Sequence, residues 1–318
     1  MGTVNTKGLL ILRWLSLLFG WSRSDKQAAL ANAALAPLER IILSDGVART
    51  LFEDYAEHRR SERGDEEIGW VLLGVRQGSE AIALAALPAG AERDAGAGHV
   101  QFNSDAQVLA SRILRQDDKR LTIIGVVHTH PGSMRSPSDG DLDGDSQWVG
   151  KLRGGEGVFA IGTADALTRG HVDSASMQAH GDLCFSWYAL GKGESRYRPL
   201  PVQVALGADR AVELRSVWDT IEAHADALNK LCRLFAKVEF DVSRTEKFAT
   251  LVMKIGLADA GQQLHLLLNG TAARYYWSVD NGMMAIDPEE TQVDRAVFLI
   301  LAELAKGPAL KSMMQSFA

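Results

Sequence analysis

The chain has 318 residues, 46% of them hydrophobic and 23% charged, which is the balance of a globular protein. Its net charge of −6 argues against nucleic acid or an anionic membrane as the main partner. Cys184 and Cys232 are too few for a disulfide framework. Because both lie in apolar patterns, they indicate buried thiols in a reducing compartment, and we expect a cytoplasmic protein.

An apolar run from Gly8 to Trp21 lies near the start of the chain. It is too short to cross a bilayer as a helix, and Arg13 lies in its middle. No small-residue cleavage site of a secreted protein follows closely. We therefore expect residues 1–35 to form an apolar helix and a linker, with the helix packed on another domain or subunit. An anchor in the membrane interface is the alternative.

Strand and helix patterns follow from residue 36 to residue 205. Ser44 is a candidate N-cap for a helix that carries Val47, Leu51 and Tyr55 at helical spacing. We predict strands at residues 40–43, 68–75, 81–86, 121–127, 157–161 and 183–190, a helix that starts at residue 104 or 105, and another helix toward residue 148. The Gly-rich stretch 89–104 predicts an irregular loop.

The apolar strand at residues 121–127 leads directly into two histidines. His128 and His130 are two residues apart, so both imidazoles leave the same face of an extended backbone. Asp141 follows eleven residues after His130, and Ser138 lies three residues before Asp141. Two imidazoles and one carboxylate are the ligands of a catalytic zinc site, which keeps its fourth position for water. The pattern therefore predicts that His128, His130 and Asp141 bind Zn²⁺.

This spacing resembles the metal motif of the JAMM (MPN+, JAB domain) metalloproteases. That family cleaves isopeptide or peptide bonds at the C-terminus of ubiquitin and ubiquitin-like proteins. Its motif also contains a Glu on an earlier strand with a Gly seven residues later, and Glu67 and Gly74 match these two positions. The resemblance implies an α/β domain of the MPN type over residues 36–205, with a mixed β-sheet flanked by helices.

The resemblance also implies roles for two further residues, in a hydrolysis in which a zinc-bound water attacks the bond. Glu67 is then the general base that passes a proton to the departing amine. Its neighbour Glu66 is the rival candidate, but adjacent strand residues face opposite sides and only Glu67 has the family's distance to Gly74. Ser138 is then a donor to the developing oxyanion, and an N-cap of the following helix is its other possible role.

A calcium site competes within the same stretch. Asp139, Asp141 and Asp143 match the first half of a calcium-binding loop. The twelfth position of such a loop carries a bidentate Glu, and here it is Gly150. Without that carboxylate we expect no strong calcium site, and we expect Asp143 and Asp145 to be solvated.

Residues 206–318 predict an α+β extension without a recognisable chemical motif. A helical stripe runs through residues 214–237, and residues 248–255 predict a second helix. Short strands are predicted at residues 264–268, 273–279 and 283–286, and Asp287-Pro288-Glu289-Glu290 predicts the start of a last helix. We expect the extension to bind a partner or substrate, for which an exposed strand edge at residues 275–277 is one candidate surface.

The resemblance implies a zinc isopeptidase similar to deubiquitinases, with ubiquitin or a ubiquitin-like protein as substrate. Short loops and an Ala- and Arg-rich composition favour a bacterial protein. Bacterial relatives occur beside ubiquitin-like proteins and their activating and conjugating enzymes, including in antiphage defence. Two alternatives stay open, a peptidase that trims the tail of a sulfur-carrier-like protein and an adaptor whose extension recruits partners. The oligomeric state is not predicted.

Overall fold

The computed structural model describes residues 35–305 except 91–93, 97–98, 102–103, 170–173, 247, 259–260 and 280–281. The apolar run predicted as an N-terminal helix, residues 8–21, lies outside the described residues. No helix in the described part of the chain is long and apolar enough to cross a membrane.

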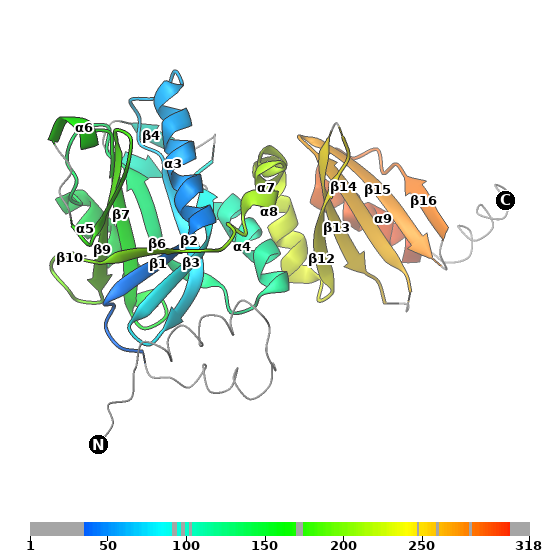
Figure 1. Cartoon of the computed structure of the whole chain (residues 1–318). Coiled ribbons are helices and arrows are strands. Elements are labelled where there is room, and N and C mark those ends of the chain that lie inside the picture. Colours follow the sequence, from blue (N-terminus) through cyan, green and yellow to red (C-terminus); the bar gives the residue numbers. More distant parts are fainter. Residues whose placement is uncertain are drawn as a thin grey trace.

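A nine-stranded mixed sheet forms the first half of the molecule (Figure 1). Its strands lie in the order β10-β9-β7-β6-β2-β3-β1-β11, and β8 pairs with β9 outside this path. They are β1 (Arg40–Ser44), β2 (Gly69–Gln77), β3 (Glu80–Pro88), β6 (Thr122–Thr129), β7 (Glu156–Thr163), β8 (Met177–His180), β9 (Leu183–Gly191), β10 (Arg198–Pro199) and β11 (Val202–Ala205). The predicted mixed sheet flanked by helices is confirmed. The domain boundary expected after residue 205 stays a prediction.

Helices cover both faces of this sheet. Alternate residues of β2 pack against the helices on opposite faces. Trp70 and Leu72 lie in the hydrophobic cluster under α3 (Asp45–Arg60), whereas Val71 and Leu73 lie in the cluster under α4 (Ser104–Asp117). Both sets are buried, so β2 is apolar on both faces, as expected of a central strand. The α3 helix begins after Ser44, whose hydroxyl accepts the Val47 N–H at 3.2 Å, as predicted.

A five-stranded antiparallel sheet forms the other half, in the order β12-β13-β14-β15-β16. Its strands are β12 (Val238–Arg244), β13 (Ala249–Gly256), β14 (Gln263–Asn269), β15 (Ala272–Val279) and β16 (Gly282–Ile286). The helices α7 (Val212–Arg215) and α8 (Trp218–Leu234) precede it, and α9 (Val293–Ala305) follows. Between the two sheets, α8 packs beside α4 (Figure 1). One hydrophobic cluster joins Leu109 of α4, Leu228 of α8 and Leu266 of β14.

Three predictions about the C-terminal part of the chain are wrong. Residues 248–255 form strand β13 rather than a helix, because β12 and β14 pair with this segment on both sides. The last helix begins at Val293, after a turn in which Glu289 adopts a φ of 53° and Asp287 accepts the Glu289 N–H. Residues 275–277 do not form an edge, since β15 pairs with both β14 and β16.

The stretch 89–104 also differs from the predicted irregular loop. It contains a short antiparallel pair, β4 (Asp94–Gly96) and β5 (His99–Gln101). Two remaining helices lie close to the nine-stranded sheet, α5 (Asp139–Ser146) and α6 (Ala166–Arg169), and a 3-10 turn covers Val149–Lys151.

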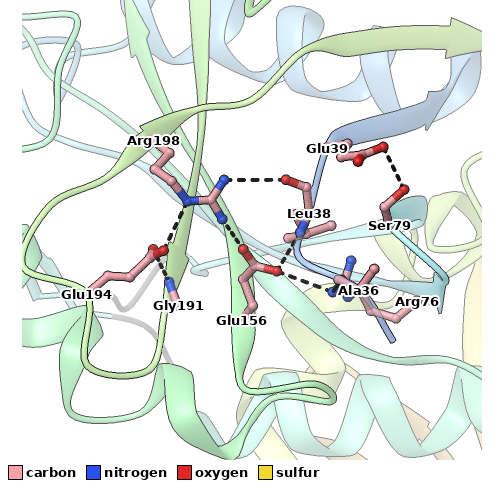
Figure 2. Close-up of polar contacts among 9 residues, drawn as sticks. All are labelled: Ala36, Leu38, Glu39, Arg76, Ser79, Glu156, Gly191, Glu194 and Arg198. Atoms are coloured by element: carbon pink, nitrogen blue, oxygen red, sulfur yellow. Dashed lines mark hydrogen bonds and ion pairs between the residues drawn. The ribbon is translucent and has the colours of Figure 1, made fainter. Parts of the chain in front are cut away.

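A buried polar network closes one end of the large sheet (Figure 2). Glu156, the first residue of β7, accepts the Leu38 N–H at 2.6 Å and pairs with Arg76 and Arg198. Since β6 and β7 run parallel, the start of β7 lies at the opposite end from the C-terminus of β6. The network therefore fixes the sheet far from His128 and His130.

Candidate metal centre

His128, His130 and Asp141 come together at the C-terminal end of β6. His128 lies in β6, His130 follows it, and Asp141 lies in the first turn of α5. The Nε2 atoms of the two histidines are 3.1 Å apart. Asp141 Oδ1 lies 3.2 Å from Nε2 of His128, and Oδ2 lies 3.5 Å from Nε2 of His130. These three side chains form a group that can hold a metal ion.

The separations between these atoms fit zinc. With zinc–ligand bonds of about 2.0–2.1 Å, two ligand atoms of a tetrahedral site lie about 3.3–3.4 Å apart. The three separations, 3.1, 3.2 and 3.5 Å, lie close to this value. Two imidazoles and one carboxylate also leave one of four positions for water, as in catalytic zinc sites.

The loop after β6 orients His130. Its Nδ1 lies 2.8 Å from the Met134 carbonyl oxygen, so Nδ1 carries the proton and Nε2 keeps its lone pair for a metal. Arg135 fixes this loop, because its Nε donates to Asp165 at 3.0 Å and its carbonyl accepts the Tyr188 hydroxyl at 2.8 Å. Burial lowers the pKa of His130, but hydrogen bonding to Asp141 and Met134 outweighs burial, so the pKa lies above its usual value.

Ser138 fixes Asp141 through a capping box at the start of α5. The Ser138 hydroxyl accepts the Asp141 N–H at 3.1 Å, and Asp141 Oδ2 accepts the Ser138 N–H at 2.6 Å. The same hydroxyl donates to Asp141 Oδ2 at 2.8 Å. Burial raises the pKa of Asp141, but hydrogen bonds from His128 and His130 hold it well below its usual range. Ser138 is thus the N-cap that was predicted as its other possible role.

Glu67 lies across from His130, two residues before β2 begins. Gly69 pairs with His128 in the antiparallel ladder of β2 and β6, and Ile68 and Thr129 exchange hydrogen bonds, so the register brings residue 67 opposite residue 130. Glu67 is only 4% exposed, and its charge helps to raise the pKa of His130. A carboxylate therefore reaches the candidate centre from a second strand.

Glu66, the rival candidate, has other contacts. Its carboxylate pairs with Arg63 at 2.6 Å, and its carbonyl lies 2.9 Å from Nε2 of His58. These contacts keep Glu66 in the loop between α3 and β2. The catalytic roles predicted for Glu67 and Ser138 stay predictions.

The acidic run after Ser138 does not form a calcium loop. Asp139, Asp141 and Asp143 lie on the regular helix α5 and so do not wrap around one point. The expectation of a solvated Asp145 is wrong, because this carboxylate accepts from the Tyr197 hydroxyl at 2.7 Å and from the Trp148 indole at 3.1 Å. Burial raises the pKa of Asp145 to about 6. Sequence spacing gave no sign of Tyr197, which lies in a distant segment.

Residues 48–178 match the family model for prokaryotic homologs of the JAB domain. This segment of the chain is a JAB domain. It contains Glu67, His128, His130, Ser138 and Asp141, and it ends before the five-stranded sheet begins. The predicted resemblance is therefore confirmed for this part of the molecule, and the match does not extend to the extension.

Comparison with solved structures adds a weaker likeness. The solution structure of protein DSY2949 from Desulfitobacterium hafniense is 15% identical, covers 53% of this chain and 94% of its own, and superposes with a TM-score of 0.37. A TM-score this low supports no conclusion about fold or function. Comparison with curated proteins finds no match.

Proposed function

We propose that the JAB domain is a zinc-dependent peptidase or isopeptidase that cleaves the bond at the C-terminus of ubiquitin or a ubiquitin-like protein. The observation that carries the proposal is the meeting of His128, His130 and Asp141 with the buried carboxylate of Glu67, which arrives on a different strand. A scaffold has no need for three ligands with zinc-compatible separations.

His128, His130 and Asp141 would hold the zinc ion, which when bound lowers the pKa of a coordinated water to about 7. Glu67 takes a proton from the attacking water and passes it to the departing amine. The Ser138 hydroxyl, turned away from Asp141, donates to the oxygen that becomes negative as the carbonyl is attacked.

The substrate class rests on the family to which the domain is similar. JAB-type enzymes act on ubiquitin-like proteins, and a bacterial ubiquitin-like pathway, with its activating and conjugating enzymes, is the proposed setting. Antiphage defence is one such setting. Release of a conjugated protein and trimming of a sulfur-carrier-like tail use the same chemistry, so the substrate panel below includes both.

The test is cleavage of a reporter protein fused to the C-terminus of ubiquitin, of bacterial ubiquitin-like proteins and of a sulfur-carrier protein. We expect zinc-dependent release of the reporter from at least one fusion, with loss on chelation and recovery when zinc is added back. Glu67→Ala should lower turnover by roughly a hundred- to ten-thousand-fold, as expected for a lost proton-transfer group.

Glu66→Ala is the matched control, because it removes the adjacent carboxylate and should keep most of the activity. If Glu66→Ala abolishes turnover while Glu67→Ala stays active, the assignment of the base is wrong. Fusions that bind tightly but are never cleaved would make the protein an adaptor instead.

A further inference from the structure

A cavity of about 230 Å³ lies where the JAB domain meets the extension. We call it the junction cavity; it is lined mainly by Asp54 and His58 of α3, Ile68 and Trp70 around the start of β2, Ala89 after β3, and Trp218 at the start of α8. Its size exceeds the roughly 150 Å³ that accommodates a benzene ring in an engineered protein cavity. One large side chain therefore fits.

The walls of the junction cavity are apolar and carry no uncompensated charge. Two tryptophans, Trp70 and Trp218, line it together with Ile68. The one carboxylate, Asp54, accepts from the Trp70 indole at 3.1 Å and pairs with Arg215 of α7. A neutral apolar group therefore fits the cavity better than a charged one.

Trp218 also offers a hydrogen-bond donor. Trp218 is 8% exposed, and its Nε1 is buried without a hydrogen-bond partner among the described residues. A buried donor without an acceptor costs free energy, which a carbonyl oxygen would recover once the ring turns to meet it. A peptide supplies such an oxygen beside each of its side chains.

The junction cavity is lined by a residue that is next to Glu67 in the sequence. Ile68, which lines it, follows Glu67 directly, and the Ala89 N–H donates to the Gly69 carbonyl at 2.8 Å. Adjacent residues of an extended chain face opposite sides, so Glu67 and Ile68 point to the two sides of the chain just before β2 begins. A polypeptide that crosses this strand end can reach both.

We propose that the junction cavity is a subsite for one large, uncharged apolar side chain of the substrate polypeptide. The inference rests on the proposed function, because it assumes that a polypeptide approaches the metal centre. It assigns the extension a part in substrate selection, since Trp218 and Arg215 belong to the extension and Asp54 and Trp70 to the JAB domain.

Peptide titrations followed by NMR test this subsite without relying on cleavage. The probes are acetylated and amidated Gly-Gly-Xaa-Gly-Gly peptides in which Xaa is Leu, Phe, Asp or Lys, added to the full chain labelled with ¹⁵N. We expect the Leu and Phe peptides to shift the indole N–H signals of Trp70 and Trp218, and the Asp and Lys peptides to leave them unchanged. The signal of Trp187, whose ring is fully buried and bonded to Gln178, serves as the internal reference.

Trp218→Phe separates binding from folding. Because the Trp218 N–H has no partner among the residues that the structure describes, its removal costs no hydrogen bond in the free protein, and any fall in the melting temperature reflects only the smaller buried ring. Binding of the Leu peptide should nevertheless weaken about five- to tenfold. Absence of any Trp218 shift with all four peptides, or equal shifts with Lys and Leu, would overturn the subsite. Neither result depends on zinc binding or on Glu67, so failure of the subsite can be distinguished from failure of the proposed function, which the cleavage assay tests.

Discussion

At the scale of single residues, Ser138 combines a structural and a proposed chemical role in one hydroxyl. It caps α5 by accepting the Asp141 N–H and also donates to Asp141 Oδ2, which faces His130. Loss of this hydroxyl therefore affects the helix, the ligand and the proposed oxyanion together. The three effects differ in size and can be measured separately.

Ser138→Ala should lower the free energy of unfolding by about 1 kcal/mol, as loss of an N-cap does. If the hydroxyl also stabilises the oxyanion, turnover should fall by roughly a hundred-fold or more. Thermal melts and kinetics with the cleaved fusion measure the two effects. Ser136→Ala, at an exposed neighbour in the same loop, is the control. A turnover loss of only a few-fold would leave Ser138 as a cap alone.

The three candidate metal ligands could be grouped from the sequence because their spacing is local and their side chains are chemically distinctive. Strand alternation also separated Glu67 from Glu66. The contact between His130 and Met134 could not be predicted from the sequence, because the acceptor is a backbone carbonyl that any residue would supply. Asp145 was misjudged for a related reason, since its partner Tyr197 is distant in the sequence.

At the scale of elements, Asp118 ties the end of α4 to the segment that leads into the extension. It accepts from Arg120 at 2.7 Å and from Arg210 at 2.9 Å and is 8% exposed. The hydrogen bond from the Arg120 side chain lowers the pKa of Asp118 to about 2, despite burial. A carboxylate with a lowered folded-state pKa stabilises the fold above its unfolded pKa and loses that effect as the pH falls.

Asp118→Asn should therefore lower the free energy of unfolding by about 1–2 kcal/mol at pH 7, allowing for solvent screening of the partly exposed arginines. The difference from the wild type should shrink as the pH falls from about 4 toward 2. Denaturant titrations at several pH values measure it. Asp117→Asn, which alters the exposed neighbouring carboxylate, should have little effect at any pH. A pH-independent loss would contradict the ionic origin.

The elements that were predicted wrongly are those whose secondary structure depends on segments that pack or pair with them. Val252 and Ile255 occur at a spacing compatible with a helix, but pairing with β12 and β14 makes the segment a strand. Asp287 and Pro288 read as a helix start, yet the chain makes a further turn before Val293. By contrast, the strand that carries His128 was predictable because its apolar residues from Ile124 to Val127 are continuously buried.

At the scale of the whole molecule, the two sheets share a helical layer and one hydrophobic cluster. Leu109 and Ile113 of α4 lie in the same buried cluster as Ile221 and Leu228 of α8. The edge strand β12 is tied to α4 as well, since Gln116 and the backbone of Phe240 exchange hydrogen bonds of 2.8 and 3.3 Å. The extension is therefore packed against the JAB domain through a shared apolar cluster, and we expect the two to unfold together.

Leu228→Ala tests this coupling. Leu228 is fully buried, and its truncation should lower the free energy of unfolding by about 2–5 kcal/mol. The indole NMR signals of Trp70, in the nine-stranded sheet, and Trp277, in the five-stranded sheet, should be lost in one transition. Leu234→Ala at the exposed end of the same helix should change stability by less than about 0.5 kcal/mol. Separate transitions for the two indoles would show that the halves fold independently.

The metal content of the purified full chain is the direct test of a zinc site at His128, His130 and Asp141. Elemental mass spectrometry should find about one zinc ion per chain, bound by two imidazoles and one carboxylate. The double variant His128→Ala, His130→Ala should lose that zinc, whereas Glu67→Ala should retain it, because Glu67 is proposed to act on the water and not on the metal. Calcium in place of zinc, or full zinc content in the double variant, would contradict the account.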